Sequence, residues 1–234
     1  MRAAPAGSPA RCRLSRSAAF FDLDRTLIKR SSVLALAPSF RKRGLISRVG
    51  LVKSAFWQLL FVLRGVSAER VRSAAEDGMK ILNGFSVAEM ESLVGDAMET
   101  VLRPLVYAEP MNLVEQHRAR GDKVYIVSAT LQEIVHHIAD DLGFDGAIGS
   151  TCEIVDGVYT GRSLRAAHGE GKAEAVRQLA ADEGLDLTSS TAYSDSYSDV
   201  PFLEAVGHPV AANPDRKLRR IAQERGWPVI DFAS

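Results

Sequence analysis

After Pro110 the chain alternates between short apolar runs and longer amphipathic segments, and this alternation limits the folds that it can adopt. Short apolar runs suit buried strands, whereas apolar residues spaced three and four apart suit helices that cover a sheet. Strands that alternate with helices along a chain usually pair in parallel. The predicted strands span 124–127, 145–149, 190–193, 209–212 and 229–231, and the predicted helices end near Arg120 or span 131–142, 171–184, 200–206 and 214–225.

One further strand lies near the start of the chain. Residues 18–23 (AAFFDL) form an apolar run, and Asp22 lies near its end. Such a run is typical of a buried parallel strand that presents a carboxylate at its carboxyl end. A hairpin is also predicted over residues 152–160, because this segment alternates around Asp156-Gly157, a dipeptide favoured in tight hairpin turns.

Residues 31–107 differ from both flanking regions. They lack strand alternation, and their apolar residues are spaced as in helices, from Leu45 to Leu63 and from Val87 to Met98. The sequence therefore predicts an α/β fold with a Rossmann-like parallel-sheet core and an inserted all-helical cap. The predicted parts are a disordered basic tail (1–16), a first piece of core (17–30), the cap (31–107) and the remaining core (108–234).

Composition excludes several classes of protein. With 46% hydrophobic residues among 234, the chain can bury a sizeable core, which excludes disordered and fibrous proteins. No apolar run approaches the roughly 18 residues of a membrane span, so we expect a soluble protein. Cys12 and Cys152 lie far apart, which excludes a disulfide framework and a thiolate metal cluster. A cytoplasmic location fits best.

Charge is balanced overall but uneven along the chain. Residues 1–72 hold 15 Lys or Arg against three acidic residues, although the whole chain holds 29 of each sign. Nucleic-acid binding is not expected, because the chain is neutral and has no recognition motif. The basic cap and its apolar segment 55–62 suggest weak contact with acidic membrane. Alternatively, the apolar side chains Trp57, Leu60 and Phe61 pack inside the cap and the basic residues form its solvated face.

Polar residues cluster where the predicted strands end. Ligands bind at the carboxyl ends of strands in open α/β sheets, so these clusters are expected to converge on one edge. The clusters are Asp22-Leu23-Asp24-Arg25-Thr26, Ser128-Ala129-Thr130, Lys172 at the start of a helix, and the run from Ser194 to Asp199.

These residues resemble the signatures of the haloacid dehalogenase superfamily, and within it the phosphoserine-phosphatase-like hydrolases that carry a helical cap. The resemblance covers about residues 18–232 and includes DLDRT, VSAT, GEGKAEAV and DSYSD in the family order. It implies a phosphatase with a helical cap inserted just after the first motif.

A phosphate monoester carries about two negative charges, so carboxylates can approach it only beside a neutralising cation. Mg²⁺ is the natural candidate, with Asp22, the Asp24 backbone carbonyl and Asp195 as oxygen ligands. Asp22 is then the expected nucleophile, which would form an aspartyl-phosphate.

The remaining roles follow from this chemistry and from the family resemblance. Asp24 is expected to protonate the leaving alcohol and then to deprotonate the attacking water. Ser128 and Lys172 are expected to bind the phosphoryl oxygens. The supporting residues are Thr26, Ala129 and Asp199, of which Asp199 is expected near the metal or its waters.

Each residue also has a simpler interpretation. An Asp at a strand end is often a turn residue or a helix N-cap, and Ser128 suits the N-cap of the helix beginning near Leu131. Lys172 would then be a solvated helix residue, and Asp199 a capping residue without direct metal contact.

The sequence departs from enzymes that act on phosphoserine at four positions or segments. No carboxylate occurs in residues 27–32, where such enzymes read the substrate ammonium, and Gly78 aligns with their cap Arg. Arg25 replaces a small residue of the first motif, and Ser194 replaces a Gly of the last.

The sequence therefore predicts a Mg²⁺-dependent phosphomonoesterase for a small phosphorylated metabolite, phosphoserine-like or another anion. One alternative is a phosphotransferase or mutase that shares the aspartyl-phosphate step. Another is a non-enzymatic module that binds anions or membrane through the basic cap. The oligomeric state is not predicted.

Overall fold

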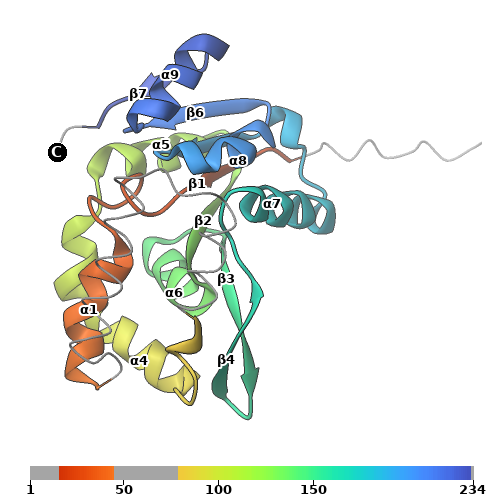
Figure 1. Ribbon diagram of the computed structural model, residues 1–234. Helices are drawn as coiled ribbons and strands as arrows, with labels where there is room; N and C mark the ends of the chain where they lie inside the picture. The colour runs from red at the N-terminus through yellow and green to blue at the C-terminus, as the bar shows by residue number, and fades with distance from the viewer. Residues whose placement is uncertain (1–15, 45–78, 233–234) are drawn as a thin grey trace, which may run out of the picture.

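The computed structural model describes residues 16–44 and 79–232. Within these ranges seven strands form one sheet in the order β4-β3-β2-β1-β5-β6-β7 (Figure 1). All neighbouring strands are parallel except the antiparallel pair β3 and β4, so the predicted α/β fold is confirmed. The strands are β1 (Ala18–Phe21), β2 (Lys123–Leu131), β3 (Gly146–Val155), β4 (Val158–Arg165), β5 (Thr191–Ser194), β6 (His208–Ala212) and β7 (Val229–Ile230).

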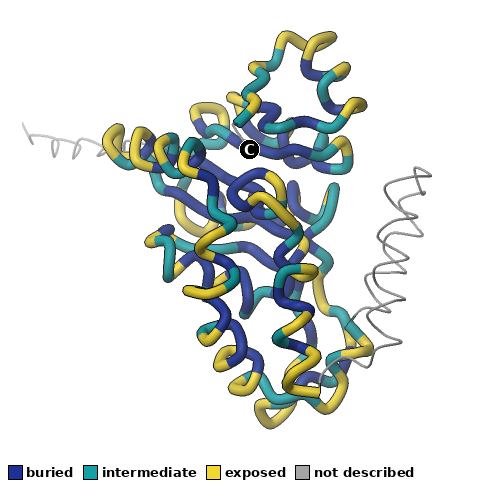
Figure 2. The backbone as a smooth tube through the Cα atoms, turned by 90° about the vertical axis from the view of Figure 1, so that its left-hand side faces the viewer, coloured by how far each residue is buried: buried dark blue, intermediate teal, exposed yellow. Residues whose placement is uncertain are grey.

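Helices cover both faces of the sheet, because successive strand side chains point to opposite faces. Phe21 of β1 belongs to the apolar cluster under α5 (Ala108–Ala119) and α6 (Gln132–Leu142). Phe20 belongs to a second cluster on the other face. Figure 2 shows the buried strands inside and exposed turns on the outer helices. The second cluster lies under α7 (Glu170–Glu183), α8 (Val200–Glu204) and α9 (Arg216–Arg225).

Four helical elements with defined bounds lie in the described part of the predicted cap. Leu36 of α1 and Leu93 of α4 are buried in the same cluster that lies under α6. The four elements are α1 (Ser32–Lys42), α4 (Val87–Ala97), the π-helix η1 (Met98–Leu102) and the 3₁₀ turn η2 (Arg103–Leu105).

Several predictions lie outside the described residues. These are the tail up to residue 15, the helical spacing from Leu45 to Leu63, the apolar segment 55–62 and the alignment of Gly78. The division of the chain into core and cap stays a prediction. In the described part of the chain, no helix is long and apolar enough to cross a bilayer.

The two chain segments that join this helical region to the sheet pair with each other. Ile28 and Val106 form an antiparallel bridge. The backbone N–H of Lys29 donates to the Leu105 carbonyl at 2.8 Å, and that of Tyr107 donates to the Leu27 carbonyl at 2.9 Å. The segment that follows the first polar cluster and the segment that precedes α5 therefore lie side by side.

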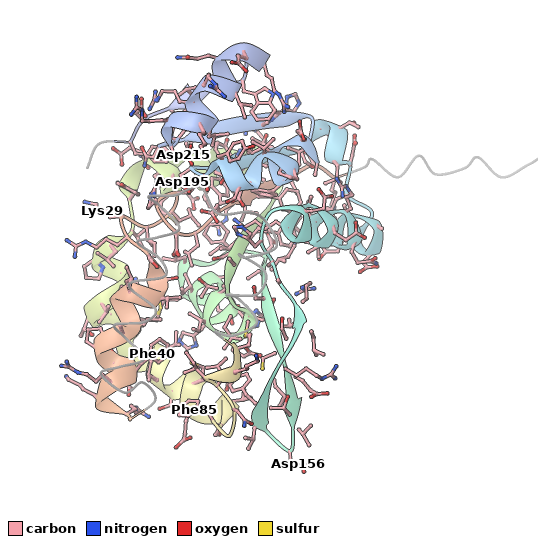
Figure 3. All side chains as sticks on the ribbon, viewed as in Figure 1. Lys29, Phe40, Phe85, Asp156, Asp195 and Asp215 are labelled. Atoms are coloured by element: carbon pink, nitrogen blue, oxygen red, sulfur yellow. The ribbon has the colours of Figure 1, made fainter. Side chains whose placement is uncertain are left out.

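The predicted hairpin is present, and it is longer than expected. Asp156 and Gly157 form its turn, both with positive φ, as a tight turn requires. The strand predicted over 145–149 continues without a break to Val155, because β3 pairs with β2 in its first half and with β4 in its second. Asp156 lies at the far tip of this ribbon (Figure 3).

A buried polar network ties three strands together below the site edge. His117 of α5 lies with Nδ1 2.7 Å from Asp122 Oδ2 and with Nε2 2.8 Å from the Tyr193 hydroxyl. Asp122 also accepts a hydrogen bond from Ser17, and the Tyr193 ring stacks on Phe21 at 4.4 Å. The network thus fixes the start of β1 and β2 relative to β5.

We expect this network to make the protein sensitive to mild acid. Burial lowers the pKa of His117, against the opposing effect of Asp122, so folding favours the neutral imidazole. The free energy of unfolding should therefore fall as the pH drops below about 6.5, because protonation of His117 then favours the unfolded chain. Urea unfolding of wild type and His117→Gln between pH 5 and 8 should show a smaller loss in the variant. The exposed His136→Gln serves as control, and an equal loss in all three proteins would contradict the assignment.

Candidate active site

The first polar cluster follows the central strand of the sheet. β1 has β2 on one side and β5 on the other, and Phe21 lies opposite both Ile126 and Tyr193. The chain runs from β1 toward β2 and β3, and later returns to form β5 to β7 on the other side. Asp22 therefore lies where the strand order reverses, which is the usual ligand site of an open α/β sheet.

A buried lysine bridges two carboxylates at this point. Lys172 Nζ lies 2.5 Å from Asp22 Oδ1 and 2.6 Å from Asp199 Oδ2, and all three side chains are buried. The first turn of α7 delivers Lys172. Gly171 permits the close approach of this turn, because a Cβ there would lie 2.0 Å from the Ala166 carbonyl oxygen.

The acceptor Asp199 is held by a second donor. The Ser194 hydroxyl donates to Asp199 Oδ2 at 2.8 Å, so the Ser that replaces the expected Gly supports the carboxylate that binds Lys172. Asp199 was expected near a metal or its waters, and its observed partners are Lys172 and Ser194. Asp199 is buried, with 2% of its surface exposed.

Asp24 is anchored by the start of the helical region. Its Oδ1 accepts from the backbone N–H of Ser32 at 2.8 Å, and the Ser32 hydroxyl lies 3.0 Å from that of Thr130. Burial raises the pKa of Asp24, while Ser32 and Lys172 oppose this rise, which favours a carboxyl group able to hold a proton. The sequence analysis placed Thr130 in a polar cluster but gave no role to it or to Ser32, and the polarity of both residues at the ends of two motifs was the available signal.

Ser128 does not cap α6, contrary to one expectation. β2 continues to Leu131, which is the N-cap of α6, and the Ser128 hydroxyl accepts from the Thr130 backbone N–H at 3.1 Å. The strand extends because Leu131 pairs with Ser150 after a register shift. Ser128 is buried, and it lies two residues after Ile126, which pairs with Phe21. It is therefore at the same edge of the sheet as Asp22.

Two predicted supporting residues differ in their surroundings. Thr26 is fully buried, and its hydroxyl oxygen has no hydrogen-bond partner among the described residues. Ala129 is exposed, and its carbonyl accepts from the Ser150 hydroxyl at 2.8 Å.

Asp195 lies on the β6 side of the site. Its Oδ2 is 2.8 Å from Arg25 Nη2, and its backbone carbonyl accepts from the Asp215 N–H at 2.8 Å. Asp195 and Asp215 are neighbours at this edge (Figure 3). Burial raises the pKa of Asp195 to about 7; Asp199 adds to the rise and Arg25 opposes it.

The charges around Asp22 do not cancel. Among the residues that the structure describes, Asp22, Asp24, Asp195 and Asp199 are acidic, whereas Lys172 and Arg25 supply two positive charges. Burial, Asp199 and Asp195 raise the pKa of Asp22 well above its ordinary value, and Lys172 acts in the opposite direction. Burial disfavours the charged form of Lys172, but Asp199 and Asp22 outweigh it and raise the pKa of Lys172.

This charge distribution fits a divalent cation. Across the described ranges, no three His, Cys, Asp or Glu side chains form a metal cluster. The expected ligands are the carboxylates of Asp22 and Asp195 and the backbone carbonyl of Asp24. This set contains only two ligating side chains, so it is compatible with the absence of a three-side-chain cluster among the described residues. Mg²⁺ commonly binds one or two carboxylates and keeps several waters. The donor set present is therefore of the kind that Mg²⁺ accepts.

Comparison with known proteins identifies the family. The model of the haloacid dehalogenase-like hydrolases matches residues 19–204, which is most of the chain. The chain belongs to the haloacid dehalogenase-like hydrolases. This hydrolase match includes every predicted site residue, from Asp22 to Asp199.

Individual relatives agree with this assignment. A probable phosphatase of Mycobacterium tuberculosis is 42% identical over 219 residues, which cover 94% of this chain and 76% of that protein. Phosphoserine phosphatase SerB1 of the same species is 38% identical over 218 residues, 92% of this chain and 71% of that one. A solved structure from Bordetella pertussis, described as a protein of unknown function, superposes with a TM-score of 0.81 at 35% identity and covers 93% of this chain and 99% of that one.

Proposed function

We propose that this haloacid dehalogenase-like hydrolase is a Mg²⁺-dependent phosphatase that cleaves small phosphate monoesters through an aspartyl-phosphate. The observation that carries the proposal is the buried Lys172, which bonds to both Asp22 and Asp199 at the carboxyl edge of β1. An ammonium group held between two carboxylates orients both of them, and its third N–H remains as a donor for a phosphoryl oxygen.

Asp22 and Asp24 divide the chemistry between them. An Asp22 carboxylate oxygen attacks phosphorus as the bond from phosphorus to the ester oxygen breaks. Asp24 donates its proton to the departing alkoxide, which leaves as an alcohol. Water then attacks the acyl phosphate, Asp24 accepts the proton of that water, and phosphate leaves with Asp22 regenerated.

The neighbouring residues bind and orient. Lys172 neutralises Asp22 and the phosphoryl oxygens, Ser128 donates its hydroxyl to one of those oxygens, and Asp199 positions Lys172. Mg²⁺, held by Asp22, Asp195 and the Asp24 carbonyl, would supply charge neutralisation for the transferring group. Ser32 ties Asp24 to the start of the helical region, which supports a coupling between that region and proton transfer.

The substrate class is that of small phosphorylated metabolites. One relative is named a phosphoserine phosphatase, but here residues 27–32 contain no carboxylate to bind a substrate ammonium group. The proposed setting is the cytoplasm, which is supported by the low number of cysteines, two in 234 residues.

A substrate panel tests this function. The full chain is incubated with p-nitrophenyl phosphate, phosphoserine, sugar phosphates, glycerol phosphates and nucleoside monophosphates, and released phosphate is measured. We expect turnover of at least one monoester with Mg²⁺ and a loss of at least about 100-fold in EDTA, restored by added Mg²⁺. Turnover that EDTA leaves unchanged would contradict the metal, and no turnover across the panel would contradict the activity.

Adding methanol to the same reactions separates hydrolysis from phosphoryl transfer. A hydrolase releases mainly inorganic phosphate, whereas a transferase gives mainly methyl phosphate. If methyl phosphate is the main product, the protein is a phosphotransferase that shares the aspartyl-phosphate step, and the hydrolase assignment is wrong.

A further inference from the structure

Arg25 occupies a backbone conformation that arginine does not favour. It follows Asp24 in the first motif with a φ of +64°, in the left-handed region that glycine adopts without steric cost. Its carbonyl accepts from Asn213 Nδ2 at 3.2 Å, and Asn213 Oδ1 accepts from the Phe232 N–H at 2.7 Å. The turn is thus held from outside, and a strained residue held in a site points to a function of its side chain.

The Arg25 side chain reaches one site carboxylate. Its Nη2 lies 2.8 Å from Asp195 Oδ2, and the Asp195 side chain is only 7% exposed whereas that of Arg25 is 51% exposed. Lys172, a second cation among the described residues of the site, bonds to Asp22 and Asp199. Asp199 and Asp215 add negative charge around Asp195. Lys172 forms no bond to Asp195, and the Arg25 guanidinium neutralises this carboxylate instead.

We propose that Arg25 is a counter-ion of Asp195 that competes with the divalent cation and thereby sets the metal affinity of the site. The inference rests on the proposed function, because it takes Asp195 as a metal ligand. A guanidinium on Asp195 Oδ2 occupies an oxygen that a metal would use, and its charge repels a dication placed nearby. The half-exposed Arg25 side chain can withdraw into solvent when the cation binds, whereas the buried Lys172 cannot.

Two consequences follow for the metal-free and metal-bound protein. Without metal, Arg25 relieves repulsion among Asp195, Asp199 and Asp215 and keeps the two segments that carry them, after β5 and after β6, in place. With metal, the ion pair must be broken first, so binding is weaker than the carboxylates alone would give. A residue that only fills space beside the turn would have neither effect.

The test measures Mn²⁺ binding without any turnover, from the electron paramagnetic resonance signal of free Mn²⁺ titrated with the full chain. The proteins are wild type, Arg25→Gln, the charge-preserving Arg25→Lys, the distant Arg219→Gln and Asp195→Asn. We expect Arg25→Gln to bind Mn²⁺ about five- to tenfold more tightly, with Arg25→Lys and Arg219→Gln within about twofold of wild type. In EDTA, Arg25→Gln should unfold at a lower temperature than Arg25→Lys.

The outcomes separate the two proposals. Equal or weaker Mn²⁺ binding by Arg25→Gln, with normal binding by wild type and loss of binding in Asp195→Asn, overturns the counter-ion role alone. Tighter binding by both Arg25→Gln and Arg219→Gln also overturns it, because the effect would then be one of net charge. No Mn²⁺ binding by wild type, or unchanged binding by Asp195→Asn, overturns the metal site itself and the counter-ion with it.

Discussion

Replacing Asp22 by Asn is expected to lower kcat for phosphate release by at least about 1000-fold, because the amide cannot act as the nucleophile. The fold should persist, since the amide oxygen can still accept from Lys172 Nζ, which lies 2.5 Å from Asp22 Oδ1. The free energy of unfolding should change by no more than about 2 kcal/mol. Steady-state phosphate release and urea unfolding measure the two effects on the same preparation.

Asp140→Asn is the matched control for this variant, because Asp140 is an exposed carboxylate on α6. It should retain wild-type turnover. An Asp22→Asn protein that releases phosphate at the wild-type rate would show that another group forms the covalent bond. Loss of turnover together with global unfolding would instead mean that Asp22 is needed for structure, and the nucleophile assignment would lose its support.

Local sequence patterns predict the strands of the sheet and the helices that cover it, because the spacing of apolar residues in a segment indicates which of its side chains are buried. They also predict which edge carries polar residues, since parallel strands bring their carboxyl ends together. This is why Asp22 and Lys172, 150 residues apart, were expected at one edge, and they are in hydrogen-bond contact there. The chemical roles of these residues remain predictions.

Other features depend on tertiary contacts that no local pattern reports. β2 extends through Ser128 to Leu131, although these residues are not an apolar run, because Leu131 pairs with Ser150. The bond from the Ser32 N–H to Asp24 requires that α1 begin directly beside the first motif. Arg25 was visible in the sequence as a departure from a small residue, but its partner Asp195 was not, because a side-chain direction depends on the turn that carries it.

Removing the Lys172 charge is the change expected to damage both stability and activity. In Lys172→Met, Asp22 and Asp199 remain buried without the cation that bonds to both of them. Breaking a buried ion pair by removing one partner costs about 3–5 kcal/mol, because a charge is left without compensation in a poorly solvated place. Urea unfolding in EDTA should show this loss, and phosphate release should fall below detection.

Two further variants decide whether charge is the cause. Lys123→Met removes a more exposed lysine that pairs with Asp145, and it should cost about 1 kcal/mol or less. Adding Asp199→Asn to Lys172→Met removes one of the two stranded carboxylates, so part of the lost stability should return while activity does not. If the double variant is less stable than Lys172→Met, the loss comes from packing of the lysine stem. Lys172 would then be a structural side chain, and the site would have to bind phosphoryl oxygens by other donors.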